Sequence, residues 1–426
     1  MRTIDLLLVG ASQVVTVDGG DGPKAGPQAM NDLGVIEYGA VAIHRGRVVE
    51  VGDTITLAQK YRGLRRISCR NRTILPGLVD PHTHPAFARM REDEFAMRCR
   101  GASYEEIFEA GGGIHASARR LREQPIEGLV TGIRRRFDRM LLHGTTTVEA
   151  KSGYGLNTES EIKSLQAIRR ASRDHPMRVV RTFLGAHAMP PEHAERRETY
   201  VREVIEEMLP RIERRKLATF CDVFVEKGAF TVDEGRRILM AAKKHGLRPK
   251  VHADQFRDGG GAALAAEVGA ISAEHLDATG PEGIAVLAKK GVIPVLLPGA
   301  CLFLDLDRPN ARAMIDAGCA VALATDFNPG SSPTENLHLI ASLGCTQLGM
   351  TPEESIVAIT RNAAAAVGLE AKAGRIARGR PADLVLLDAP SYLHVPYRMG
   401  TNLVHTVIAK GRIVVERGRI VRGKRR

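Results

Sequence analysis

Ile74-Leu-Pro-Gly-Leu-Val-Asp80 opens a series of short apolar runs, each followed by a helix-like amphipathic stretch. This alternation decides the fold, because continuous apolar strands that alternate with helices predict a parallel sheet covered on both faces. The later runs are Thr145–Ala150, Arg178–Gly185, Cys221–Val225, Pro249–His252, Ala270–Ala273, Val292–Leu297 and Ala320–Thr325. Eight such units over about 250 residues predict an α/β protein with a (β/α)8 TIM-like barrel. The alternative, a doubly wound sheet, lacks a GxGxxG motif after the first strand.

The two ends of the chain have a different pattern. Short β-like runs separated by turn residues occupy roughly the first 70 and the last 50 positions. We expect these ends to assemble into one small β-sandwich domain, formed by residues 1–73 together with 372–426. Residues 74–371 then form the barrel.

Composition and charge exclude several classes of protein. The chain has 426 residues and a net charge of +12, but its arginines are dispersed among acidic residues, and aromatic residues make up only 4%. A surface that stacks nucleic-acid bases is therefore poorly supplied, and the basic tail Arg422–Arg426 is better explained as a solvated end. No apolar stretch approaches the roughly 18 residues of a spanning helix, so we expect no membrane partner. Six cysteines without CxxC spacing predict a reduced, cytoplasmic protein.

Polar side chains that can bind a metal stand at the ends of several apolar runs. In a barrel these ends meet on the catalytic face. The side chains are His82, His84, His187, His252, His275 and Asp326. Two residues apart on an extended strand, His82 and His84 point to one face about 6–7 Å apart. With His252 and Asp326 they supply three imidazoles and one carboxylate, a set that can hold an ion and keep a position open for water.

Longer motifs surround these residues. They are Pro76–His84, Lys151-Ser-Gly-Tyr-Gly155, Phe183–Glu192, Asp326–Asn336 and Pro381–Val385. Together with the histidines they resemble the amidohydrolase superfamily and, within it, the imidazolonepropionase family. The resemblance implies one Zn²⁺ or Fe³⁺ ion per chain, held by His82, His84, His252 and Asp326. It also implies a homodimer.

The same resemblance implies a reaction and a set of residues around a small-molecule substrate. The reaction is the hydrolysis of the cyclic amide of 4-imidazolone-5-propanoate to N-formimidoyl-L-glutamate, in histidine degradation, with Asp326, His275 and His187 as catalytic residues. The substrate-binding residues are Arg91, Tyr154, His187, Gln255 and Ser331, with Asn328 and Gly330 facing the product. A propionate carboxylate favours a guanidinium fork such as that of Arg91. Lys151, which in some members of the superfamily bridges two metals, is here expected to be structural.

Alternative functions differ from this one in observable ways. Another cyclic amidohydrolase or a deaminase of the same superfamily would act on a different ring. Deaminases carry a glutamate three residues after the histidine of the fifth strand, where this chain has Gln255, and an amide cannot carry a proton at accessible pH. A metal-free scaffold would fail a metal analysis, and an RNA-binding protein would show salt-dependent binding of RNA.

Overall fold

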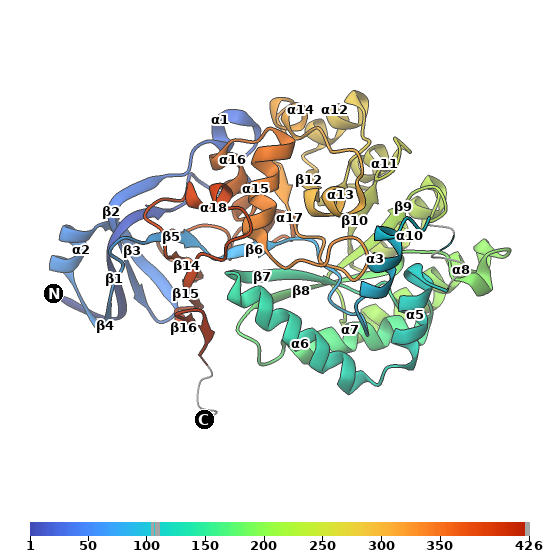
Figure 1. Ribbon diagram of the computed structural model, residues 1–426, viewed down its shortest axis with the longest axis horizontal. Coiled ribbons are helices and arrows are strands. Elements are labelled where there is room, and N and C mark those ends of the chain that lie inside the picture. The colour runs from blue at the N-terminus through green and yellow to red at the C-terminus, as the bar shows by residue number, and fades with distance from the viewer. Residues whose placement is uncertain (104–105, 107–110, 422–426) are drawn as a thin grey trace.

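A computed structural model describes residues 1–103, 106 and 111–421. The basic tail Arg422–Arg426 lies outside the described residues. Within them, the chain forms an eight-stranded parallel sheet that closes almost completely into a barrel, and a nine-stranded mixed sheet beside it (Figure 1). The predicted fold class is confirmed.

The barrel strands follow one another in chain order around the sheet. They are β6 (Leu78–Asp80), β7 (Thr145–Lys151), β8 (Arg178–Ala186), β9 (Phe220–Val225), β10 (Arg248–Ala253), β11 (Ser272–His275), β12 (Ile293–Leu296) and β13 (Ala322–Leu323). A parallel bridge between Thr83 and Phe327 joins the two ends of the sheet. The backbone N–H of His84 donates to the carbonyl of Phe327 at 2.8 Å, which closes the barrel at its catalytic end.

The first apolar run is divided between the two sheets, whereas we had expected a single strand over Ile74–Asp80. β5 (Thr73–Pro76) belongs to the mixed sheet and β6 begins the barrel. Gly77 separates them, and a Cβ at this position would collide with the side chain of Thr146. The tight packing of this glycine against the neighbouring strand is a tertiary contact that the apolar pattern does not reveal.

Strands from both ends of the chain share the mixed sheet. Its members are β1 (Arg2–Val15), β2 (Val35–His44), β3 (Arg47–Asp53), β4 (Tyr61–Ser68), β5, β14 (Leu384–Leu387), β15 (Val404–Ala409), β16 (Arg412–Glu416) and β17 (Arg419–Ile420). β5 joins the two groups, since it pairs with β1 on one side and β14 on the other. In Figure 1 the blue and red strands accordingly lie together beside the barrel. The strands of the expected sandwich are thus hydrogen-bonded into one continuous sheet.

Helices cover the outside of the barrel. The longer ones are α5 (Gly113–Glu123), α6 (Ile126–Leu142), α7 (Thr158–Ser172), α10 (Val232–Lys244), α11 (Gly261–Val268), α12 (Pro281–Lys290) and α15 (Leu337–Leu348). Shorter ones are α1 (Gly26–Met30), α3 (Glu92–Cys99), α8 (Arg197–Arg202), α9 (Leu209–Arg215), α13 (Pro298–Leu304), α14 (Ala311–Asp316), α16 (Pro352–Ala358), α17 (Arg361–Ala366) and α18 (His394–Tyr397). The short helix α2 (Thr54–Lys60) instead packs against β2 and β3 of the mixed sheet. The main apolar core lies between the strands and these helices. None of the described helices is both long and apolar enough to cross a membrane.

Candidate active site

One buried carboxylate ties the carboxyl ends of the first and last barrel strands together. Asp80, the last residue of β6, accepts hydrogen bonds from the backbone N–H of Thr325 at 3.1 Å and from its hydroxyl at 2.6 Å. His82 and His84 come shortly after this carboxylate in the chain, and Asp326 comes directly after the threonine. The two bonds therefore bring three of the predicted metal ligands to one place.

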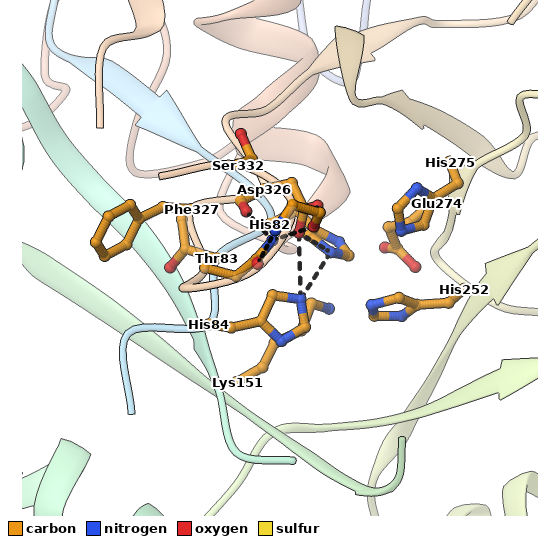
Figure 2. A network of polar contacts seen from close by, with 12 residues as sticks. His82, Thr83, His84, Lys151, His252, Glu274, His275, Asp326, Phe327 and Ser332 are labelled. Atoms are coloured by element: carbon orange, nitrogen blue, oxygen red, sulfur yellow. Dashed lines mark hydrogen bonds and ion pairs between the residues drawn. The ribbon is translucent and has the colours of Figure 1, made fainter. Parts of the chain in front are cut away.

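The ligand atoms of these three side chains point toward one another (Figure 2). His82 Nε2 and His84 Nε2 are 3.1 Å apart, and each lies 3.4 Å from Oδ1 of Asp326. Ligands bound at about 2.0–2.1 Å in tetrahedral geometry are about 3.3–3.4 Å apart. The triangle has the size of one face of a tetrahedral metal site.

His252, on β10, faces this triangle from the opposite wall (Figure 2). Its ring centroid lies 4.5 Å from that of His82 and 5.4 Å from that of His84. One nitrogen of His252 lies within 4.8 Å of nitrogens of His82 and His275. Its Nε2 is buried and has no hydrogen-bond partner among the described residues. A buried, unpartnered nitrogen opposite a triangle of ligands fits a metal ion, so the residues present suit the predicted centre.

The protonation states of these groups also suit a metal. Burial lowers the pKa of His82 well below its usual range, and neighbouring positive charges lower it further. Burial lowers the pKa of His252 to about 4, although the carboxylate of Asp222 opposes the shift. For Asp326, burial raises the pKa, but His84, His275 and His252 together outweigh this effect, and the pKa lies below its usual value. Metal binding requires neutral imidazoles and an ionised carboxylate, and both forms are favoured here.

A cavity of about 110 Å³ opens above the ligands. Its lining contains most of the residues that the sequence assigned to the site: His84, Arg91, Tyr154, His187, His252, Gln255, His275, Asp326, Asn328 and Ser331, together with Ile114 and Phe224. Of the remaining predicted residues, His82 is fully buried beside the lining ligands. Gly330 packs against Arg91.

Arg91 directly precedes α3 in the chain and lines the cavity. Its Nη1 lies 3.6 Å from Oε2 of Glu94, and its Nε is buried with no hydrogen-bond partner among the described residues. A Cβ on Gly330 would overlap the guanidinium. The glycine therefore leaves the space in which Arg91 lies, and the guanidinium keeps an unused donor for an anionic ligand.

Tyr154 and His187 stand together on one wall. Their ring centroids are 5.4 Å apart, and His187 stacks on His84 at 5.1 Å. His187 Nδ1 lies 3.0 Å from the carbonyl oxygen of Gly153 and donates to it, which leaves Nε2 as an acceptor. Burial lowers the pKa of His187 well below its usual range, so this acceptor form is favoured.

The loop after β13 is organised by Asn328. Its Oδ1 accepts from the backbone N–H groups of Gly330 (2.7 Å) and Ser331 (2.8 Å), and its Nδ2 donates to the carbonyl of Asp326 at 2.7 Å. Ser331 Oγ donates to Oδ2 of Asp326 at 3.3 Å. The carboxylate is thus held with Oδ1 toward the histidines. Asn328 lines the cavity, but its amide forms hydrogen bonds with the backbone of the same loop.

His275, the last residue of β11, completes the far wall. Its ring centroid lies 5.4 Å from that of His252, and its Nδ1 is 3.7 Å from Oδ2 of Asp277. Burial lowers the pKa of His275, but the nearby carboxylates of Asp277 and Asp326 outweigh it and raise the pKa. The pKa of His275 is therefore shifted in the opposite direction from those of His82 and His252. In its protonated form His275 can stabilise negative charge that develops in the cavity.

Buried charges inside the barrel were not predicted as part of the site. They are Glu149, Asp222, Lys250 and Glu274, which join Lys151 below the ligands. Lys151 Nζ lies 2.8 Å from Glu149 Oε2 and 2.7 Å from Asp222 Oδ2, which agrees with a structural role for this lysine. For two of them the signal was available in the sequence, because Glu149 stands two positions before Lys151 and Lys250 two positions before His252, and each pair shares a face.

Asp222 links this charged group to the metal ligands. Its Oδ2 lies 2.9 Å from Nδ1 of His252, and its Oδ1 accepts from the backbone N–H of the same residue at 3.2 Å. Burial raises the pKa of Asp222, but His252 and Lys151 outweigh it and hold the pKa well below its usual range. The carboxylate therefore favours a proton on Nδ1 of His252, which leaves Nε2 as the unprotonated nitrogen, as partners of metal-binding histidines commonly do.

Known proteins are similar to this chain in sequence or in fold. Residues 73–414 match the amidohydrolase family model. An imidazolonepropionase of a Geobacillus species is 49% identical over 97% of this chain and 99% of its own length. That of Geobacillus thermodenitrificans is 50% identical over 96% and 98%. The crystal structure of an adenosine deaminase from Xanthomonas campestris with bound zinc has a TM-score of 0.73 at 18% identity and covers 99% of this chain and 95% of that one, which is a likeness of fold. The chain belongs to the amidohydrolase family and, within it, to the imidazolonepropionases.

Proposed function

We propose that this hydrolase of carbon–nitrogen bonds opens the ring amide of 4-imidazolone-5-propanoate and releases N-formimidoyl-L-glutamate, a step of histidine degradation. The observation that carries the proposal is the position of a metal-sized ligand triangle beside a cavity that Arg91 also lines. A ring amide with a propionate side chain presents two groups that this arrangement fits: a carbonyl and a carboxylate. Membership of the imidazolonepropionases supports the same substrate.

The centre would hold one Zn²⁺ or Fe³⁺ ion per chain, through His82, His84, His252 and Asp326. Three imidazoles and one carboxylate suit either metal, and the related fold with bound zinc supports the first. When bound, such an ion is a Lewis acid that lowers the pKa of water toward about 7.

Arg91, Tyr154 and His187 would bind and orient the substrate. The guanidinium takes the propionate carboxylate, for which it keeps a free Nε–H. The acceptor Nε2 of His187 and the ring of Tyr154 form the wall against which the imidazolone ring lies. Gln255, Asn328 and Ser331 line the same cavity, and Gly330 gives Arg91 its space.

Asp326 would move the proton. Its carboxylate takes a proton from the attacking water while the water oxygen bonds to the ring carbonyl carbon, and then gives that proton to the ring nitrogen as the carbon–nitrogen bond breaks. His275 stabilises the negative charge on the carbonyl oxygen, because its neighbouring carboxylates favour the protonated form. Deaminases have a glutamate at the position of Gln255 to transfer a proton. An amide cannot do so at accessible pH, which argues against deamination.

Turnover of 4-imidazolone-5-propanoate, made in situ from urocanate by urocanase, tests the function. We expect its ultraviolet absorbance to fall with the purified protein, to stop falling after chelation, and to fall again when Zn²⁺ or Fe³⁺ is returned. No turnover by the metal-replete protein would contradict the proposal. Arg91→Ala should mainly raise KM, and an unchanged KM would remove Arg91 from the carboxylate site.

We also propose that the protein acts as a cytoplasmic homodimer. The family resemblance supports the dimer, and the scattered thiols, four of which are buried, suit a reducing compartment. Light scattering on the eluting protein measures the oligomeric state, and a monomeric mass would refute the dimer.

A further inference from the structure

Glu161 is a fully buried carboxylate that the proposed mechanism does not use. It lies in the first turn of α7, and its side chain is turned back toward the loop that connects β7 to this helix. Its Oε2 accepts from the backbone N–H of Gly153 at 3.0 Å. Its Oε1 accepts from those of Gly155 at 2.6 Å and Leu156 at 3.1 Å. One carboxylate thus holds three backbone donors of a single short loop.

This loop carries one wall of the cavity. Tyr154 stands between the two held glycines, and the carbonyl of Gly153 accepts from Nδ1 of His187 at 3.0 Å. A displacement of the Gly153 peptide would therefore move the tyrosine and also release the imidazole from its acceptor form. The two rings depend on the same peptide.

The glycines of the loop show how closely the carboxylate and the imidazole approach. A Cβ on Gly155 would lie 2.8 Å from Oε1 of Glu161 and 2.5 Å from its backbone nitrogen. Gly153 has a φ of +118°, and a Cβ there would lie 2.9 Å from Nδ1 of His187. Any side chain at either position would separate the groups that hold the wall.

A second clamp holds the outer side of the same loop. Arg122, on α5, donates to the carbonyls of Gly155 at 2.9 Å and Leu156 at 2.8 Å. Its guanidinium also lies 2.8 Å from Glu192, in the segment that follows His187. Arg122 bonds carbonyl oxygens of Gly155 and Leu156, whereas Glu161 bonds backbone N–H groups. Of these two side chains, Glu161 is the one that bonds Gly153.

We infer that Glu161 is a positioning residue for substrate recognition, which sets Tyr154 and the acceptor form of His187 through the backbone of residues 153–156. The inference rests on the proposed function in one respect, that these two rings contact the substrate. Glutamine at position 161 retains one acceptor oxygen but places an amide N–H where an acceptor is needed. One buried backbone donor then loses its partner.

The test compares Glu161→Gln with the wild-type holoenzyme. We expect KM for 4-imidazolone-5-propanoate to rise about tenfold or more while kcat changes much less, since ring placement and not proton transfer is disturbed. In protein labelled with ¹⁵N-histidine, the Nδ1–H resonance of His187, assigned with His187→Gln, should shift or disappear. Gly155→Ala should reproduce both effects and serves if Glu161→Gln does not fold.

Glu354→Gln is the matched control. Glu354 is also fully buried in the first turn of a helix, α16, and accepts from the backbone N–H of Thr351 at 2.8 Å, but it does not line the cavity. The variant Glu354→Gln should lower Tm without changing KM or the Nδ1–H resonance of His187. A wild-type KM and resonance in Glu161→Gln would overturn the inference, and so would an equal rise of KM in Glu354→Gln. If the wild type does not turn the compound over, the proposed function fails, and the resonance still decides the inference.

Discussion

Asp222→Asn removes the carboxylate that holds His252 in its metal-binding form. The Oδ2 atom of Asp222 lies 2.9 Å from Nδ1 of His252 and 2.7 Å from Nζ of Lys151, and all three side chains are almost fully buried. Asparagine has the same shape but no charge, and it has one acceptor oxygen where two are used. If the amide nitrogen takes the place of Oδ2, the imidazole and the lysine both lose their acceptor. If it takes the place of Oδ1, the backbone N–H of His252 loses its acceptor.

The expected effect on metal binding follows from this geometry. Loss of a carboxylate behind a metal-binding histidine typically lowers metal affinity by about 10–100-fold, or about 1.4–2.7 kcal/mol. Breaking a buried ion pair costs about 3–5 kcal/mol of stability. We expect the lower end here, because Lys151 keeps Glu149 at 2.8 Å.

Competition with a chromophoric chelator measures the metal affinity of the apo-protein reloaded with Zn²⁺, and Tm of the apo-protein measures the stability. Asp277→Asn is the control, since Asp277 is a buried carboxylate beside a histidine, His275, that is not one of the four proposed ligands. It should leave the Zn²⁺ affinity unchanged. Equal affinities of Asp222→Asn and the wild type would refute the reasoning.

Three further predictions concern other parts of the protein. Asp326→Asn should lower kcat by orders of magnitude with the fold intact, and near-normal turnover of the metal-replete variant would contradict its role in proton transfer. Gly330→Ala should raise KM as Arg91→Ala does, because the methyl group takes the space of the guanidinium; steady-state kinetics that leave KM unchanged would show that the loop yields instead. Burial lowers the pKa of His338 from 6.5 to about 4 in the folded protein. As the pH falls through this range, the unfolded chain binds a proton at this residue before the folded protein does, so the free energy of unfolding falls. His338→Gln should flatten the dependence of Tm on pH in this window, by up to about 3 kcal/mol, and an unaltered slope would show that other groups cause it.

The sequence was sufficient to predict the barrel and the metal-binding side chains at its strand ends, because both depend on local patterns. Other cavity residues, such as Tyr154 and Gln255, were expected from the family resemblance. Apolar runs of regular length give the strands, and the carboxyl ends of parallel strands meet at one face. His252 and Asp326 are far apart in the chain, yet the topology alone brings their strand ends together. Their roles in binding and catalysis are predictions that the experiments above address.

Features that depend on contacts between distant segments could not be predicted in this way. Asp222 and Glu161 are charged residues without a motif, and only the folded chain shows that one meets His252 and the other three backbone amides. The first apolar run is divided at Gly77, and Thr146 packs so closely there that a Cβ would collide with it. Neither a buried charge nor a packed glycine changes the periodicity of apolar residues, which is the signal that sequence reasoning uses.

The division at Gly77 has a consequence for the order in which the protein matures during synthesis. β5 pairs in register with β1 at Thr73 and Ile74, whereas all of Thr73–Pro76 pairs with β14, which comes after the whole barrel in the chain. Until Leu384–Leu387 leave the ribosome, one edge of Thr73–Pro76 stays open beside the residues that carry His82 and His84, and open edges invite wrong pairing. All four proposed metal ligands are therefore synthesised before β5, which precedes His82 and His84, has its β14 partner. We expect ribosome-bound chains that end before β14 to be the ones that need a chaperone.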